Sequence, residues 1–312
     1  MQTTPDRMQA AAIEVSDLTK DYGQNRGVFN ISLAVQAGEC FGFLGPNGAG
    51  KTTTIRHIMG FSKPQQGFTA VLGRDSWRYQ AQLQNQIGYL PGEITLPLGL
   101  SGTKFLAMVR QLHKCADATY CQTLAEMFEL KTNRDIKQMS LGDKRKLAIV
   151  AAFVHDPQIL ILDEPTSGLD PVMQQVFIDF VLKEKRRGKT VFFSSHIFRE
   201  IESCCSRVAI IKEGQIVSEF AAAELKTRSD HVYRIGFGSE AAYLDFAARD
   251  YHFTQRIPQA ALVTVLINDR QINQLVMDLA ASNITEFYEI PFTLEDYFMQ
   301  FYKDEHDYQE IR

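Results

Sequence analysis

The chain has 312 residues, 45% of them hydrophobic and 22% charged, which is enough material for two domains with buried cores. A formal charge of -4 gives no general attraction to nucleic acid or anionic lipid. Five cysteines form no CxxC pair, and no segment approaches the roughly 18 consecutive apolar residues that span a bilayer. We therefore expect a soluble globular protein with reduced thiols that does not cross a membrane by itself.

The first half of the chain carries the pattern of an α/β sheet. Residues 1–12 form a tail without the apolar core of a signal peptide. Residues 13–15 and 31–35 alternate between apolar and polar, as half-buried antiparallel strands do. Continuous apolar runs, typical of buried parallel strands, occur at 41–44, 159–162 and 191–193. These runs predict an α/β fold with a mixed sheet.

A glycine-rich motif follows the first apolar run and fits the pattern G-x-x-x-x-G-K-[ST]. Its residues are Gly45, Pro46, Asn47, Gly48, Ala49, Gly50, Lys51 and Thr52. Glycines let the backbone aim successive N-H groups at a phosphate, and the following helix adds its positive N-terminal end. Lys51 adds a full charge, and the hydroxyl of Thr52 can hold Mg²⁺. The motif predicts a nucleotide-phosphate site rather than an incidental glycine turn.

Residues 97–154 change to a helical pattern. Phe105, Met108, Val109 and Leu112 are spaced i, i+3, i+4 and i+7, as on one face of a helix. No comparable strand signal interrupts this stretch. It predicts a helical insertion between two strands of the sheet.

Within this insertion, the sequence MSLGDKR at 139–145 precedes a predicted helix at 146–154. Ser140 and the backbone N-H groups after it form a second candidate anion site at a helix start. In isolation the same residues would be an ordinary helix cap.

Two later strands end in residues suited to phosphate chemistry. Asp163 and Glu164 follow the run 159–162, at the carboxyl edge where open α/β sheets bind ligands. Asp163 would hold Mg²⁺, and Glu164 would act as the general base that polarises an attacking water. His196 ends the next run and could hydrogen-bond a γ-phosphate.

A different pattern begins after residue 220. Residues 221–229 look like a short helix and linker. Beyond them the expected order is strand 231–237, helix 240–249, strands 252–257 and 262–267, helix 271–281 and strand 284–290. The order β-α-β-β-α-β is that of a ferredoxin-like α+β unit, and the two helices argue against a small β-barrel.

Taken together, these motifs resemble the nucleotide-binding subunit of an ATP-binding cassette (ABC) transporter, over roughly residues 13–220. GPNGAGKTT at 45–53, which adds Thr53, resembles the Walker A loop, and ILILDEP at 159–165 resembles Walker B. SGLD at 167–170 resembles the D-loop, His196 the switch histidine, and Tyr22 the aromatic residue that stacks on adenine.

The resemblance implies that the cofactors are ATP and Mg²⁺. It implies catalytic roles for Lys51, Glu164 and His196, and metal binding by Thr52 and Asp163.

The sequence departs from the usual motifs of the family at two places. The signature, usually LSGGQ, reads MSLGD at 139–143. Where the family usually has a Gln after IGYLP, this chain has Gly92 and then Glu93, which makes Glu93 a further candidate for Mg²⁺.

The resemblance also implies partners, because the signature of one cassette completes the ATP site of another. Ser140 and Gly142 would therefore act in trans, in a homodimer or with a close relative. The cassette would sit at the cytoplasmic face of the cell membrane on separate transmembrane permease subunits. A cassette that ends in a small domain, with the motif LEDYF at 294–298, resembles the bacterial drug, peptide and lipid exporters more than the importers. The resemblance therefore implies an ATP-hydrolysing subunit that powers export.

The expected domains are a tail at 1–12, the ATPase at 13–222 with its insertion at 97–154, a linker at 223–230 and a small domain and tail at 231–312. One alternative is a soluble cassette ATPase that acts on ribosomes or nucleic acid, although we expect no nucleic-acid partner. Another is a C-terminal ligand-binding module that regulates the ATPase.

Overall fold

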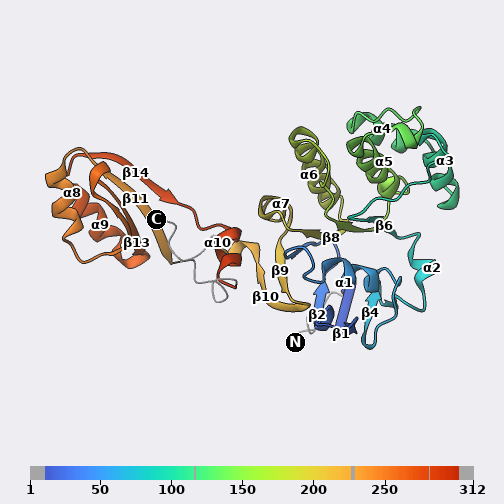
Figure 1. Cartoon of the computed structure of the whole chain (residues 1–312), viewed down its shortest axis with the longest axis horizontal. Helices are drawn as coiled ribbons and strands as arrows, with labels where there is room; N and C mark the ends of the chain where they lie inside the picture. The colour runs from blue at the N-terminus through green and yellow to red at the C-terminus, as the bar shows by residue number, and fades with distance from the viewer. Residues whose placement is uncertain (1–10, 116, 226–228, 281, 302–312) are drawn as a thin grey trace, which may run out of the picture. The chain divides into compact units, whose positions relative to one another are not determined.

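The computed structural model describes residues 11–115, 117–225, 229–280 and 282–301. The chain divides into two compact units, residues 1–221 and residues 222–312 (Figure 1). Each unit has its own cluster of buried hydrophobic side chains. The predicted linker begins close to this division, and its residues 226–228 lie outside the described residues.

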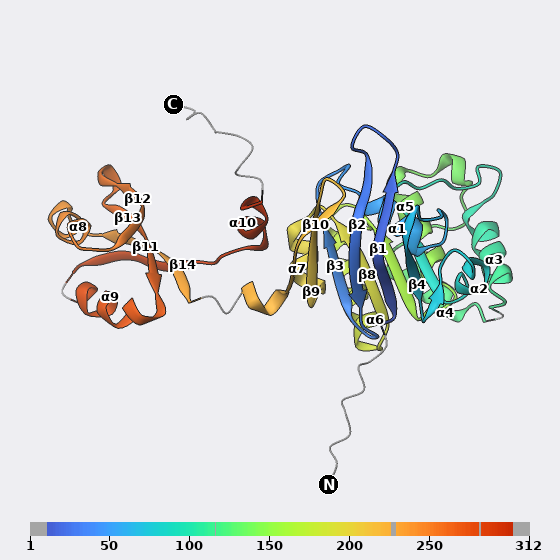
Figure 2. The same ribbon diagram turned by 90° about the horizontal axis from the view of Figure 1, so that it is seen from below.

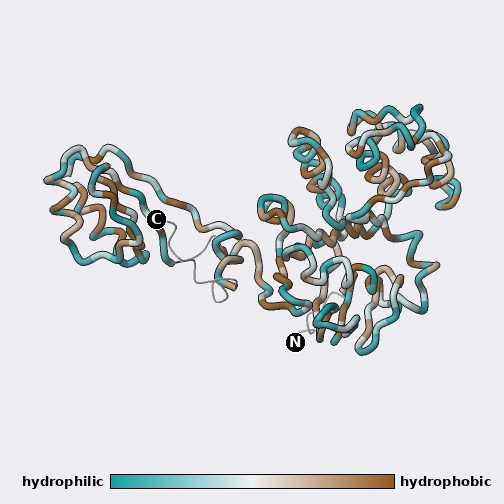
Figure 3. The backbone as a smooth tube through the Cα atoms, viewed as in Figure 1, coloured by the Kyte–Doolittle hydropathy of each residue, from teal (hydrophilic) through white to brown (hydrophobic). Residues whose placement is uncertain are grey.

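A six-stranded sheet forms the centre of the first unit. Its order is β10-β9-β3-β8-β7-β6, with β10 antiparallel to β9 and the other neighbours parallel. The strands are β3 (Cys40–Leu44), β6 (Ile87–Leu90), β7 (Ile159–Asp163), β8 (Thr190–Ser195), β9 (Arg207–Lys212) and β10 (Gln215–Ala221). Every residue of β3, β7 and β8 is buried, as their continuous apolar runs predict. The tube in Figure 3 is largely brown where Figure 1 labels β8.

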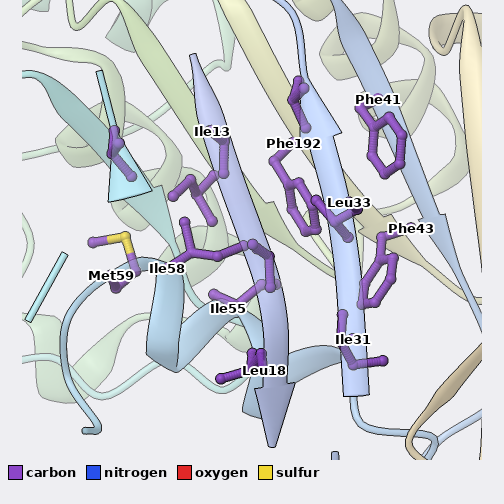
Figure 4. Close-up of a cluster of buried hydrophobic side chains, with 14 of the residues drawn as sticks. Ile13, Leu18, Ile31, Leu33, Phe41, Phe43, Ile55, Ile58, Met59 and Phe192 are labelled. Carbon is purple, nitrogen blue, oxygen red and sulfur yellow. The ribbon is translucent and has the colours of Figure 1, made fainter. Parts of the chain in front are cut away.

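A second sheet of the first unit is antiparallel, in the order β2-β1-β4-β5. It consists of β1 (Ile13–Asp21), β2 (Gly27–Val35), β4 (Gln66–Val71) and β5 (Arg74–Asp75). Helix α1 (Lys51–Ile58) packs beneath it, and Figure 4 shows Ile55 and Ile58 of this helix pointing towards Ile13 and Leu18 of β1. This core fixes the position of the helix that follows the glycine-rich loop.

The described helices of the first unit other than α1 are α2 (Gln80–Leu83), α3 (Gly102–Leu112), α4 (Thr119–Met127), α5 (Leu141–Phe153), α6 (Pro171–Arg186) and α7 (Phe198–Cys204), with a 3₁₀ turn at Ile136–Gln138. In Figure 1, α5, α6 and α7 lie on the side of the six-stranded sheet opposite α1. Figure 1 shows α3, α4 and α5 gathered together, between β6 and β7 in the sequence. No helix among the described residues is both long enough and apolar enough to cross a bilayer.

Two details of the helical insertion differ from the sequence expectation. Helix α5 begins at Leu141 and not at residue 146, because the side chain of Ser140 accepts a hydrogen bond from Asp143 N and caps the helix there. On α3 the fully buried apolar side chain is Leu106, whereas Met108 and Leu112 are 40% and 70% exposed. The helical spacing identified the helix but not the face that it buries.

The second unit contains one antiparallel sheet in the order β12-β13-β11-β14. A 3₁₀ turn (Ala222–Leu225) precedes β11 (Asp230–Phe237), α8 (Glu240–Ala247), β12 (His252–Ile257), β13 (Leu262–Asn268), α9 (Ile272–Leu279), β14 (Ile284–Ile290) and α10 (Leu294–Met299). Two further 3₁₀ turns are Pro258–Ala260 and Asp269–Gln271. Figure 2 shows α8 and α9 beside this sheet, and their side chains share one core with alternate residues of β11 and β13. Both helices therefore cover the same face.

A pair of histidines links α3 to the end of α5. The rings of His113 and His155 stack with centroids 3.8 Å apart. Burial lowers the pKa of His155 to about 4 and also lowers the pKa of His113. Each ring has a buried Nδ1 without a hydrogen-bond partner among the described residues. Protonation of either ring would place a charge in this stack.

Acid should therefore weaken the first unit through this pair. Because the folded pKa of His155 lies below the usual value of 6.5, the unfolded chain binds more protons between about pH 4 and pH 6.5, and stability falls as the pH falls through this window. The free energy of unfolding should therefore decrease between pH 7 and pH 5. With allowance for solvent screening, we expect His155→Gln to make this decrease smaller by about 1 kcal/mol. Urea unfolding at both pH values measures this, with His252→Gln on the exposed start of β12 as the control. An unchanged pH dependence in His155→Gln would contradict it.

A chain that ends at residue 228 should fold by itself. The first unit contains both of its sheets and its own core, so removal of residues 229–312 leaves that core intact. We expect a cooperative thermal transition in the shortened chain, followed by circular dichroism, and a soluble monodisperse protein. Aggregation, or loss of the cooperative transition, would show that the two units depend on each other.

Candidate functional site

The glycine-rich loop holds a buried lysine at the start of a helix. Helix α1 begins at Lys51, directly after Gly50. The Lys51 Nζ donates hydrogen bonds to the carbonyl oxygens of Gly45 at 2.6 Å and Pro46 at 3.2 Å, so its charge is held across the loop. It also lies 3.0 Å from Oε1 of Glu164. A fixed cation and a helix N-terminus at the same place favour an anionic ligand.

Two loop positions require glycine. Gly50 has φ +113°, which side-chain-bearing residues rarely adopt, and a Cβ there would lie 2.9 Å from Val28 Cγ1. A Cβ on Gly45 would lie 2.5 Å from the carbonyl oxygen of Ile211. The loop therefore packs against neighbouring strands with its backbone, and this close packing maintains the tight turn.

The carboxylate of Asp163, at the end of β7, joins three segments. It accepts hydrogen bonds from the hydroxyls of Thr52 at 2.6 Å and Ser194 at 2.9 Å. Burial raises the pKa of Asp163, which a nearby cation would lower again. A carboxylate and a hydroxyl in contact are oxygen ligands of the kind that Mg²⁺ prefers. The structure thus brings together the two predicted metal-binding residues.

Glu164 has a strained backbone and lies close to the side chains of Lys51 and His196. Its φ of +46° lies in the left-handed region, and its N-H donates to the carbonyl oxygen of Ser194 at 2.9 Å. Its Oε2 lies 2.6 Å from Nδ1 of His196. Its Oε1 is buried and makes no hydrogen bond, although it lies near Lys51 Nζ. A strained residue whose buried carboxylate oxygen makes no hydrogen bond is typical of a functional position.

A cavity of about 250 Å³ lies along the loop, and most predicted ligand-binding residues line it. Tyr22 is 51% exposed and lines this cavity together with Lys51 and Glu164. Of the predicted loop residues, Gly45 and Ala49 do not line it, whereas these do: Pro46, Asn47, Gly48, Gly50, Thr52 and Thr53. A flat aromatic ring and a phosphate loop thus border the same space.

A larger adjoining hollow, of about 930 Å³, contains the remaining acidic candidate. Its lining includes Glu93, Asp163, Glu164 and His196. Glu93 is exposed on the loop after β6. The described residues contain no cluster of three or more His, Cys, Asp or Glu side chains arranged to hold a metal ion.

Ser140 and Gly142 lie apart from these two spaces. Ser140 caps α5, and Gly142 lies in its first turn, where both residues are exposed or half-buried. Neither residue lines the loop cavity or the adjoining hollow. The structure therefore does not bring these two predicted ligand-binding residues to the chain's own Lys51.

Sequence reasoning missed the buried Arg145. Its guanidinium donates to the carbonyl oxygens of Pro91 at 2.8 Å, Gly92 at 2.7 Å and Ser167 at 2.7 Å. One side chain of α5 thus fixes both the loop after β6 and the loop after β7. The position of Arg145, shortly after Ser140 in the sequence, was the available signal. Its partners could not be predicted, because every residue has a backbone carbonyl oxygen and no sequence pattern marks the ones that are bound.

Ser194 and Glu200 were also missed. Glu200 accepts a hydrogen bond from Ser195 Oγ at 2.7 Å and a short one from Thr166 Oγ1. Burial raises the pKa of Glu200. The adjacent serines before His196 were a signal, because small hydroxyl residues at the end of a buried strand need polar partners.

Comparison with known proteins identifies the family of this chain. Residues 28–167 match the family model described as ABC transporter. The chain is 34% identical over 233 residues to the Nod factor export ATP-binding protein I of Paraburkholderia xenovorans, covering 70% of this chain and 73% of that protein. It is 35% identical over 229 residues to the bacitracin transport ATP-binding protein BcrA of Bacillus licheniformis, covering 70% and 72%.

Solved structures agree in fold. An ATP binding subunit of an ABC transporter superposes with a TM-score of 0.64 at 27% identity, over 69% of this chain and 92% of that one. A dimeric, ADP- and Pi-bound cassette, MJ0796, gives a TM-score of 0.61 at 21% identity, over 67% and 98%, and this shows the fold alone. The chain belongs to the ABC transporter family, as one of its ATP-binding and ATP-hydrolysing cassettes.

Proposed function

We propose that this chain is the ATPase subunit of an exporter and that separate transmembrane permease subunits use its ATP hydrolysis at the cytoplasmic face of the membrane. The relatives named for Nod factor export and bacitracin transport support this proposal. The observation that carries it is the meeting of Lys51, Asp163 and Glu164 at one edge of the parallel sheet. That edge is where open α/β sheets bind their ligands.

The residues at this edge fit the family's cofactor, ATP with Mg²⁺. Gly45 and Gly50 of the loop leave no room for a Cβ, and the buried Oε1 of Glu164 has no hydrogen bond. The loop backbone and the buried lysine suit a chain of phosphates. The Glu164 oxygen that makes no hydrogen bond suits a water molecule. When bound, MgATP supplies the phosphoanhydride bond whose hydrolysis releases free energy.

Each side chain has a separate role. Lys51 would bind the phosphate charge, while Thr52 and Asp163 would hold Mg²⁺ through their oxygens. Glu164 would accept a proton from water, and His196, which contacts Glu164 at 2.6 Å, would orient this carboxylate and hydrogen-bond the γ-phosphate.

Further residues would complete the ligand contacts. Tyr22, which lines the loop cavity, would stack on adenine. Glu93, which lines the adjoining hollow, is an additional candidate for binding Mg²⁺ through water. The loop from Gly45 to Thr53 would bind the phosphates through its backbone N-H groups.

The ATP site is completed by a second cassette, from a copy of this chain or a close relative. Ser140 and Gly142 lie at an exposed helix start that does not reach the chain's own cavities. Their N-H groups and the Ser140 hydroxyl suit a phosphate presented by a partner.

The domains are a cassette at 13–222, a linker at 223–230 and a C-terminal module at 231–312. The module is ferredoxin-like, and its strand order β12-β13-β11-β14 supports this, because the fourth strand neighbours the first and the third neighbours the second.

Two substitutions separate binding from hydrolysis. Lys51→Ala should lose most ATP affinity, because it removes the buried cation. Glu164→Gln should bind ATP and hydrolyse it at least about 10²-fold more slowly, the lower end of what a positioned base contributes. Nucleotide binding and single-turnover hydrolysis measure the two effects, and Lys63→Ala, at an exposed lysine outside both cavities, is the control. Hydrolysis by Glu164→Gln at the unmodified rate would remove this residue from the catalytic role.

ATP should join two cassettes through Ser140. In the Glu164→Gln background at about 1 µM protein, ATP should shift the chain towards a dimer and ADP should not, because only ATP carries the bridging γ-phosphate. Adding Ser140→Arg should block the shift without loss of ATP binding.

The matched control is Ser101→Arg, since Ser101 caps α3 through Lys104 N as Ser140 caps α5. Sedimentation velocity distinguishes these outcomes. A dimer that survives Ser140→Arg would exclude this helix start from the interface, whereas a monomer in ATP would require an unlike cassette or the permease.

A further inference from the structure

Strand β14 is an open edge of the C-terminal sheet. Within the described residues it pairs only with β11, in a regular antiparallel ladder from Val232–Ile290 to Gly236–Glu286. Its outer backbone groups therefore have no ladder partner in the described chain. An unpaired edge offers hydrogen bonds to another strand.

Three of the exposed side chains of β14 are large and apolar. Phe287, Tyr288 and Ile290 are 48%, 46% and 38% exposed, and the other exposed side chains of the strand are Thr285 and Glu289. The opposite edge of the same sheet, β12, reads HFTQRI, with polar side chains in its centre and a register shift in its ladder. Natural edges are commonly protected by lysine, proline or a bulge. β14 has no lysine or proline, and its ladder with β11 shifts register between Glu286 and Ile284 but is regular over residues 286–290.

The two acidic residues of the regular stretch each have a partner within the sheet. Glu286 Oε1 lies 3.3 Å from Arg234 Nε, and Glu289 Oε1 lies 2.7 Å from His231 Nδ1, whose Nε2 lies 2.9 Å from Asp269. Arg234 and His231 both belong to β11, on the inner side of β14. Both glutamates therefore make polar contacts with the neighbouring strand.

Symmetry limits which residues of two identical strands can lie opposite each other. In an antiparallel ladder, opposite residues alternate between hydrogen-bonded and non-hydrogen-bonded pairs. When a two-fold axis relates the two strands, the pair of residue i with residue j and the pair of j with i must be of the same type. Neighbouring pairs differ in type, so one residue must lie on the axis opposite its own copy. The numbers of any two opposite residues therefore add to an even number. Glu286 and Glu289 add to an odd sum and cannot be directly opposite. With Tyr288 on the axis, Glu286 faces Ile290 and Phe287 faces Glu289.

We propose that β14 pairs antiparallel with β14 of a second copy of this chain, with Tyr288 facing its own copy. The regular stretch 286–290 is centred on Tyr288, so this register uses all of its five residues. The two four-stranded sheets become one eight-stranded sheet. So short an edge buries less than a standard protein interface, and the association is weak and reversible. It needs no nucleotide, which distinguishes it from the pairing of cassettes.

The test uses the full chain without nucleotide, by sedimentation velocity from about 1 to about 100 µM, a range suited to a small interface. The wild type should shift from monomer towards dimer. Tyr288→Glu and Tyr288→Lys should each remain monomeric, because each places like charges opposite each other on the axis. An equal mixture of the two variants should associate again, because Glu then faces Lys.

Met277→Glu is the matched control, since Met277 is 72% exposed on α9 of the same unit and lies away from the edge. It should associate like the wild type, and circular dichroism should show that all variants are folded. A wild type that stays monomeric at about 100 µM overturns the proposal, as does equal loss in Met277→Glu. Association in either Tyr288 variant alone, or none in their mixture, overturns the register. Each result is independent of ATP and of Ser140, so it leaves the proposed cassette pairing unaffected.

Discussion

The buried carboxylate of Asp163 is the point at which the site is assembled. Strands β3, β8 and β7 are parallel neighbours, so the segments that leave their carboxyl ends meet at one edge of the sheet. Thr52 and Ser194 reach this edge from two of those segments and donate to Asp163. A buried carboxylate is costly unless it is hydrogen-bonded, and these two hydroxyls offset that cost. The same contacts fix α1, the loop before it and the end of β8 relative to one another.

The next residue, Glu164, adds a strained backbone and a second carboxylate to this junction. Glu164 has a left-handed backbone conformation, which costs about 1 to 3 kcal/mol for such a residue, and the hydrogen bond from its N-H to Ser194 holds it there. The turn directs the carboxylate towards Lys51 and His196 instead of along the strand. Arg145 fixes the loop that follows Glu164 through the carbonyl oxygen of Ser167. The rigid sheet thus carries a strained catalytic candidate, and a separate helix stabilises the loop beside it.

Local patterns were sufficient for most elements of the fold. Continuous apolar runs predicted β3, β7 and β8, because both faces of a central parallel strand are buried. The second unit followed its predicted order of strands and helices, with bounds that differ by a few residues. The start of α5 was wrong, because the cap at Ser140 extends the helix over residues whose apolar spacing is weak. On α3, Met108 and Leu112 have helical spacing but no covering partner, which periodicity cannot reveal.

The sequence by itself determined the chemistry of the loop, because backbone amides, a glycine turn and the following Lys51 are all local in the chain. It also placed Asp163 and Glu164 at a strand end. Only the tertiary structure decided which groups meet there: Ser194, 31 residues beyond Asp163, and the carbonyl oxygens bound by Arg145 depend on strand order and packing. Strand order likewise decided that β14, and not β13, is an edge with exposed aromatic side chains. Neighbours across a sheet are set by long-range pairing, which no short stretch of sequence contains.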